Sequence, residues 1–210
     1  MEIIKDKEEK DLYIKYSNSN FQTIKVCLIG RDNTGKTSLL ERINFRDSFK
    51  FYKESIKGKI PSVSDSFLSI LVKYKGKLFK LDLWDLAWQL KYFDLNKFLC
   101  QDADIILNFY NPFKKESFEY IKNSFQSVKE LNRKLNIKFL CKYIIIKNKC
   151  DLNETKDKKI MISDEEVLEY ADKNNLSFRN LSNLEKYGSG IEEIIEDCIN
   201  GYLNKNNKNL

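Results

Sequence analysis

The sequence contains no histidine, few glycines and prolines, and no long apolar run, and each shortage excludes a class of protein. Without histidine, the chain lacks the usual general base of serine and cysteine hydrolases and a frequent zinc ligand. Seven glycines and two prolines among 210 residues are too few for an all-β protein with many tight turns. No stretch approaches the length of a membrane-spanning helix or of a signal peptide, so we predict neither.

The cysteines and the charge distribution narrow the class further. The five cysteines are scattered and form no CxxC pair, which is typical of a reducing intracellular protein without a zinc site, so we expect a cytoplasmic location. The net charge of +6 equals that of residues 50–80 alone, where eight lysines accompany Glu54 and Asp65, 8 − 2 = +6. Lysines on a strand more often stay solvated or protect a sheet edge than bind a polyanion, so we expect no nucleic-acid partner.

Apolar runs of strand length alternate with longer amphipathic stretches, the pattern of βαβ units around a mainly parallel sheet. Lys75 and Gly76 predict a tight turn between two strands, the one antiparallel element. We therefore predict an α/β fold of three layers, with a six-stranded, mostly parallel sheet, one antiparallel hairpin strand, and helices on both faces. The predicted strands are residues 23–30, 66–74, 77–85, 103–110, 138–147 and 176–182. The predicted helices are 36–45, 114–135, 163–174 and 190–203, with a further short helix that ends at about Cys100.

The length suits one domain with a full hydrophobic core. We place this domain at residues 22–203. A polar N-terminal extension at 1–21 precedes it, and a loose polar tail at 204–210 follows it. We expect the protein to be a monomer.

A phosphate-binding motif follows the first long strand. The segment GRDNTGKTS, residues 30–38, matches G-x-x-x-x-G-K-[ST] and opens onto a helix, as the motif requires. Backbone N–H groups would surround the β-phosphate, the lysine would bridge the β- and γ-phosphates, and the threonine hydroxyl would bind Mg²⁺. The Asp32 carboxylate in this loop would be repelled by a triphosphate, so it either points to solvent or weakens nucleotide binding or turnover. The predicted nucleotide-binding residues are Asp32, Asn33, Thr34, Gly35, Lys36, Thr37 and Ser38.

A second motif, NKCD at residues 148–151, stands at the end of a predicted strand and indicates which base is bound. The Asp151 carboxylate can accept hydrogen bonds from N1–H and the 2-amino group of guanine, whereas adenine has no N1–H to donate. Lys149 would lie along the base, and Asn148 would tie this loop to the phosphate loop. The ligand is therefore predicted to be GTP or GDP, and transfer from ATP is disfavoured.

The chain resembles a Ras-superfamily small GTPase, nearest the Rab and Ras branches, over about residues 22–203. The resemblance is carried by GRDNTGKTS, LDLWDLAWQ, DADIILNFYNP and NKCDL. It implies a P-loop NTPase G-domain that binds GTP and GDP with Mg²⁺. Asp85 would hold Mg²⁺ through water, and Gln89 would orient the attacking water. Ser182 and Asn183 match the start of the family's SAK loop, whose backbone N–H binds guanine O6.

The two switch segments depart from the family's pattern. Ser62 stands where a threonine usually ligates Mg²⁺, although Ser55 and Ser64 remain rivals because this stretch is about six residues longer than the family's pattern. Trp88 replaces the glycine of the family's DxxG motif. It keeps the N–H that meets the γ-phosphate, but a left-handed tryptophan costs roughly 1–2 kcal/mol and lacks glycine's freedom to swing. The residue that stacks on guanine stays open among Phe49, Phe51 and Tyr52.

These departures leave two functions in competition. The first is a slow or atypical GTP switch in which Lys36 and Gln89 are catalytic; the second is a hydrolysis-deficient interaction protein that holds the nucleotide structurally and presents the Trp88 loop to a partner. Trp88 could also serve as part of a hydrophobic cap, with ordinary nucleotide chemistry. Protein partners are predicted at residues 49–66 and 86–93. The chain ends in NKNNKNL without the cysteines that carry the family's lipid anchor, so membrane association is expected only through a partner.

Overall fold

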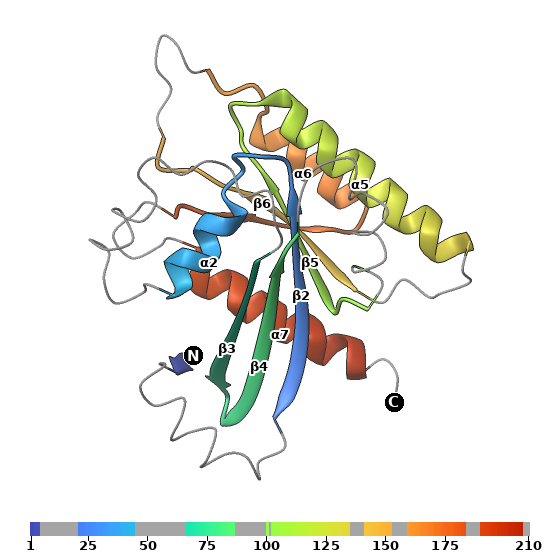
Figure 1. Cartoon of the computed structure of the whole chain (residues 1–210). Helices are drawn as coiled ribbons and strands as arrows, with labels where there is room; N and C mark the ends of the chain where they lie inside the picture. The colour runs from blue at the N-terminus through green and yellow to red at the C-terminus, as the bar shows by residue number, and fades with distance from the viewer. Residues whose placement is uncertain are drawn as a thin grey trace.

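The computed structural model describes residues 1–4, 21–44, 66–86, 100, 102–134, 141–152, 159–183 and 190–207. Within these residues, seven strands form one sheet in the order β1-β3-β4-β2-β5-β6-β7 (Figure 1). The strands are β1 Glu2–Ile4, β2 Gln22–Gly30, β3 Ser66–Tyr74, β4 Lys77–Asp85, β5 Ile105–Tyr110, β6 Lys142–Lys147 and β7 Ser177–Asn180. The described helices are α2 Lys36–Asn44, α5 Lys115–Lys134, α6 Asp164–Lys173 and α7 Ile191–Asn207.

Helices cover both faces of the sheet and produce three layers (Figure 1). Alternate residues of β2 show why both faces must be covered, because Val26 and Leu28 belong to a core with α2 and α7, whereas Cys27 and Ile29 belong to a core with α5. A third apolar cluster joins α5 and α6 to β5 and β6. A strand segment buried on both sides has apolar residues at successive positions, as residues 26–29 of β2 do.

The strand pairing confirms the predicted fold class. β2 runs parallel to β4 and β5, and β5, β6 and β7 continue in parallel. β3 and β4 form the predicted antiparallel hairpin. Its turn lies at Lys75 and Gly76, whose φ angles of 48° and 76° are the two positive values that a two-residue I′ turn requires.

Two chain ends differ from the prediction. β1 adds a short antiparallel edge strand to β3, with Glu2 opposite Lys73, which three residues were too few to reveal by alternation. At the other end, α7 continues to Asn207, beyond the predicted end of this helix at residue 203. The Lys205 Nζ lies 2.8 Å from the Asp104 Oδ1, and this ion pair holds the last helical turns against the sheet.

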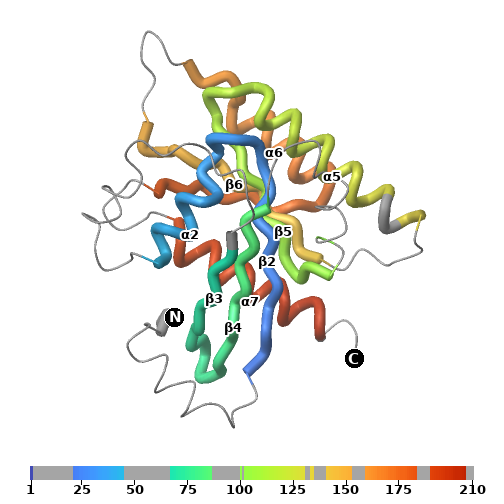
Figure 2. The backbone as a smooth tube through the Cα atoms, in the orientation of Figure 1, coloured from blue at the N-terminus to red at the C-terminus, as the bar shows by residue number. Residues whose placement is uncertain are grey.

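The sheet order positions a ligand site. β2 lies between β4 and β5, so the connections of β2 and β5 leave toward opposite faces of the sheet. The carboxyl ends of parallel strands beside such a reversal form the crevice in which α/β proteins bind ligands. Figure 2 shows the chain passing from the end of β2 through a loop into α2 at this edge. None of the described helices has the length and apolar character needed to cross a bilayer.

Candidate functional site

The loop between β2 and α2 adopts the strained backbone that a phosphate nest needs. Gly30 has φ of 143°, and a Cβ there would come within 2.5 Å of the Phe109 carbonyl oxygen. Asn33 has φ of 56°, a left-handed conformation that asparagine tolerates better than most residues. The Thr34 hydroxyl donates to the Arg31 carbonyl at 2.7 Å and closes the loop on itself. The loop is therefore shaped in part by a hydrogen bond within itself.

Lys36 folds back over this loop. Its Nζ donates to the Gly30 carbonyl at 2.7 Å and to the Arg31 carbonyl at 3.2 Å. The side chain is buried, and this burial lowers the pKa of Lys36 against the opposing attraction of Asp85 and Asp32. A buried ammonium at the N-terminus of α2 is a ready anion-binding group, because the phosphate would replace carbonyl oxygens that are weaker partners.

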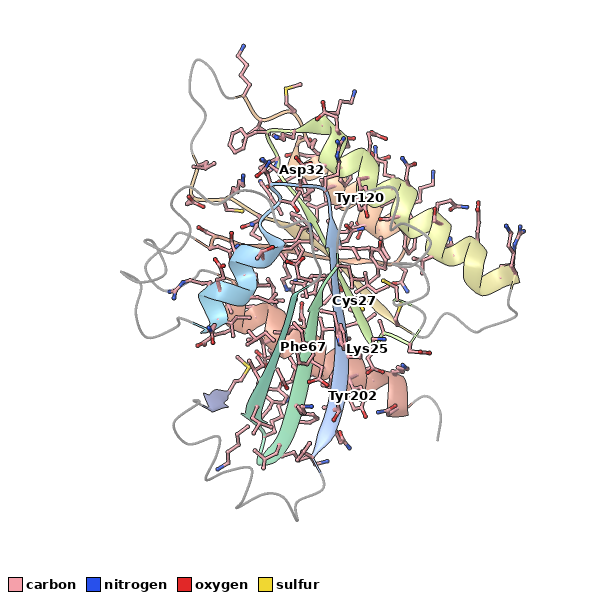
Figure 3. All side chains as sticks on the ribbon, viewed as in Figure 1. Lys25, Cys27, Asp32, Phe67, Tyr120 and Tyr202 are labelled. Carbon is pink, nitrogen blue, oxygen red and sulfur yellow. The ribbon has the colours of Figure 1, made fainter. Side chains whose placement is uncertain are left out.

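Asp32 lies on the outer side of the loop (Figure 3). Its carboxylate is partly exposed, and its Oδ1 lies 3.7 Å from the Arg31 Nε. The Asn33 Nδ2 also donates to its Oδ2 at 3.3 Å. Of the two interpretations of Asp32, this geometry favours the solvent-facing carboxylate.

Thr37 and Asp85 meet at the start of α2 and the end of β4. The Thr37 Oγ1 donates to the Asp85 Oδ2 at 2.5 Å, and Asp85 is only 2% exposed. A hydroxyl and a carboxylate are oxygen ligands of the kind that Mg²⁺ takes, together with phosphate oxygens and water. These two residues fit the predicted metal role. No group of three or more acidic or cysteine side chains among the described residues could hold a metal by itself.

The NKCD segment contacts the phosphate loop directly. The Asn148 Nδ2 donates to the Thr34 carbonyl at 2.7 Å across 114 residues of chain. Lys149 has φ of 68°, and its N–H donates to the Asn148 Oδ1 at 2.8 Å. The predicted tie between the two motifs is therefore present in the structure.

Residues 181–183 join the same site. The Ser182 hydroxyl donates to the Asp151 Oδ1 at 2.6 Å, and the Asn183 Nδ2 donates to the Gly35 carbonyl at 3.0 Å. The Leu181 N–H donates to the Lys147 carbonyl at 2.7 Å, which fixes this segment to the end of β6. The sequence placed Ser182 and Asn183 near the base but did not reveal these side-chain contacts. The signal that singled them out was their match to the start of the family's SAK loop.

Part of the predicted site lies outside the described residues. This applies to the catalytic Gln89, to the metal ligand Ser62 with its rivals Ser55 and Ser64, and to Trp88. The candidates for stacking on guanine, Phe49, Phe51 and Tyr52, and most of the two predicted partner segments also lie there. Their roles stay predictions.

The described residues next in sequence to these segments form an aromatic surface that the sequence analysis did not single out. Phe67 is 50% exposed, and its ring centroid lies 4.8 Å from that of Trp84 on the neighbouring strand. The Lys25 Nζ lies 5.9 Å from the centre of the Trp84 ring. Figure 3 shows Phe67 on β3 and Lys25 on β2, the two strands that flank β4. Phe67 follows residue 66 and Trp84 precedes residue 86, so this surface borders both predicted partner segments.

Comparisons with known proteins agree with this geometry. A profile described as the Ras family matches residues 25–204. The chain is 28% identical over 183 residues to the Ras-related protein Rab-21 of Geodia cydonium, covering 87% of this chain and 72% of that protein. It is 29% identical over 197 residues to the GTP-binding protein YPT52 of Saccharomyces cerevisiae, covering 82% and 79%. It is 30% identical over 179 residues to Rab-21 of Mus musculus, covering 83% and 71%.

Proposed function

The chain belongs to the Ras family as a Rab-like small GTPase, and from this membership we propose that it is a guanine-nucleotide switch that turns GTP over slowly. The observation that carries the proposal is the contact between two motifs far apart in sequence. Asn148, from the predicted base-binding motif, donates to the Thr34 carbonyl in the phosphate loop. A base site and a phosphate site joined in this way suit one nucleotide.

The selectivity for guanine is proposed to reside in Asp151. The Ser182 hydroxyl donates to one of its carboxylate oxygens, which fixes the orientation of the carboxylate. An ionised carboxylate only accepts hydrogen bonds, so it matches the two neighbouring donors of guanine. Asp151→Asn should lose the preference for guanine over other bases; an unchanged affinity for GTP would show that the base site has been assigned wrongly.

The phosphate side is proposed to work mainly through electrostatic positioning. Lys36 would exchange the Gly30 and Arg31 carbonyls for phosphate oxygens and stabilise charge that develops during transfer. Mg²⁺ bound through the Thr37 hydroxyl, and through water by Asp85, would neutralise charge on the β- and γ-phosphate oxygens. Gln89 is proposed to orient the attacking water. Trp88, in place of glycine, is the proposed reason for slow turnover.

A second candidate function is favoured by the surface of Phe67 and Trp84. An exposed phenylalanine whose ring packs at a tilt against a tryptophan ring is typical of a protein-binding surface. This surface borders the Trp88 segment, so a hydrolysis-deficient chain could hold nucleotide structurally and present both to a partner. Such a protein would need the nucleotide site but no turnover.

Single-turnover hydrolysis of GTP separates the two candidates. The protein is purified, its tightly bound nucleotide is identified by chromatography, and hydrolysis is followed in the parent, in Trp88→Gly and in Gln89→Leu. Measurable turnover that disappears in Gln89→Leu supports the switch. No turnover in the parent, with a large gain in Trp88→Gly, supports the interaction protein. A preference for ATP over GTP would refute both.

A further inference from the structure

Asn183 forms a second link between the base side of the site and the phosphate loop. Asn148 and Asn183 donate to successive carbonyls, those of Thr34 and Gly35, from two different segments of the chain. Both asparagine side chains are buried. The phosphate loop is therefore held at two neighbouring peptide groups.

The direction of the Asn183 amide follows from its surroundings. If its oxygen and nitrogen were exchanged, the oxygen would face the Gly35 carbonyl oxygen, and two acceptors would repel. Gly35 itself sits between the two amides, because a Cβ there would lie 2.0 Å from the Asn148 Nδ2 and 3.3 Å from the Asn183 Nδ2. The close fit of both amides against a residue without a side chain fixes their contact with the loop.

Peptide geometry transmits this contact to the other side of the loop. The described chain has no cis peptide bonds, and in a planar trans peptide the C=O and the following N–H point in opposite directions. Asn148 therefore directs the N–H of Gly35, and Asn183 directs the N–H of Lys36, away from the amides. Lys36 is the first residue of α2, where an N–H is available to an anion.

We propose that Asn183 is a positioning residue that aims the Lys36 N–H at the β-phosphate. The proposal rests on the proposed function and deepens it, because it gives Asn183 a role in phosphate affinity in addition to its place near the base. The Gly35 carbonyl also accepts from the Leu39 N–H at 3.1 Å, so Asn183 acts on a peptide already tied into α2. The preceding residue, Ser182, holds the base-side carboxylate of Asp151.

Affinities for GDP and GMP test the proposal, because only GDP carries the β-phosphate. Asn183→Ala should weaken GDP binding about 3- to 10-fold, the value expected for one hydrogen bond, and should change GMP binding less than about 2-fold. Asn183→Asp keeps the shape but has no donor and should weaken GDP binding at least as much. Ser182→Ala is the matched control from the base side and should weaken GDP and GMP by the same factor. Equal losses for GDP and GMP in both Asn183 variants, or no loss, would overturn the proposal.

Amide NMR spectra of the protein without nucleotide provide a readout independent of binding. In Asn183→Ala or Asn183→Asp, the Lys36 amide signal should move more than that of Gly35; unchanged Lys36 signals in both variants would overturn the proposal. If the parent binds neither GDP nor GMP, the proposed function fails. Titration with inorganic pyrophosphate then decides the role of Asn183. Weaker binding in both Asn183 variants than in the parent supports that role, and equal binding, or no binding in the parent, refutes it.

Discussion

Replacing Gly35 by alanine should destabilise the empty protein and weaken nucleotide binding together, because the added methyl group has no room. Its carbon would lie 2.0 Å from the Asn148 Nδ2, and Gly35 has a φ of 92°. The left-handed backbone alone costs an alanine about 1–2 kcal/mol. If Asn148 moves to make room, it loses its bond to the buried Thr34 carbonyl, which adds about 1–3 kcal/mol. The free energy of unfolding should therefore fall by about 2–5 kcal/mol.

Gly76→Ala is the matched control for this substitution. Gly76 has a similar φ of 76°, but nothing lies within 4 Å of the position that a Cβ would occupy. The free energy of unfolding of this variant should fall only by the cost of the left-handed backbone, about 1–2 kcal/mol. It should bind GDP like the parent, because the turn lies at the end of the sheet away from Asp85. The difference in the free energy of unfolding between Gly35→Ala and Gly76→Ala therefore measures the effect of the contact with Asn148.

Urea unfolding of both variants without nucleotide, followed by GDP titration, measures the two effects. Gly35→Ala should unfold at a lower urea concentration than Gly76→Ala with the same dependence on urea, since the surface exposed on unfolding is unchanged. Its GDP affinity should fall by at least about tenfold, which corresponds to 1.4 kcal/mol. If Gly35→Ala is no less stable than Gly76→Ala, the two amides do not restrict the phosphate loop as described.

Three further substitutions test the electrostatics. Asp85→Asn removes the carboxylate beside Thr37 and with it a proposed Mg²⁺ ligand. Chelation of Mg²⁺ by EDTA should therefore speed GDP release strongly from the parent and much less from the variant. Equal acceleration in both proteins would contradict the metal role of Asp85. Asp32→Asn should tighten GTP binding about 2-fold at low salt, fading at high salt, because its carboxylate is partly exposed; weaker binding would contradict its solvent-facing orientation. Burial raises the pKa of Tyr120 to about 12 from 10.0, so the folded state keeps a proton that the unfolded chain releases, and stability should fall between these pH values. In Tyr120→Phe this fall, measured by urea unfolding at about pH 9 and about pH 11, should be smaller; an identical fall would contradict the burial effect.

The sequence predicted the parts of the molecule that depend on local patterns. The phosphate loop has a fixed spacing, and the hairpin turn at Lys75 and Gly76 needs residues that tolerate positive φ. Strands β5 and β6 are visible because both faces of the sheet are buried there, which makes most of their positions apolar. Asn148 was assigned its contact with the phosphate loop because the motif itself carries that information.

Contacts between distant segments that belong to no motif could not be predicted in the same way. Asn183 lies 148 residues from Gly35, and nothing in the amino-acid sequence of either segment indicates that their polar groups form a hydrogen bond. β1 escaped prediction because its pairing depends on the open edge of β3 and not on its own three residues. The C-terminal end of α7 is held by an ion pair between Lys205 and Asp104, which lie 101 residues apart in the sequence.

Both described ends of the chain lie away from the phosphate loop (Figure 1). Glu2 pairs with Lys73 near the hairpin turn, while Ser66, at the other end of β3, pairs with Asp85. Lys205 contacts Asp104, which immediately precedes β5 at the edge opposite the site. A biosensor surface that captures the protein through either end would therefore hold it with the nucleotide side facing the solution. Association and release of nucleotide or partner could then be timed on the immobilised, unmutated chain.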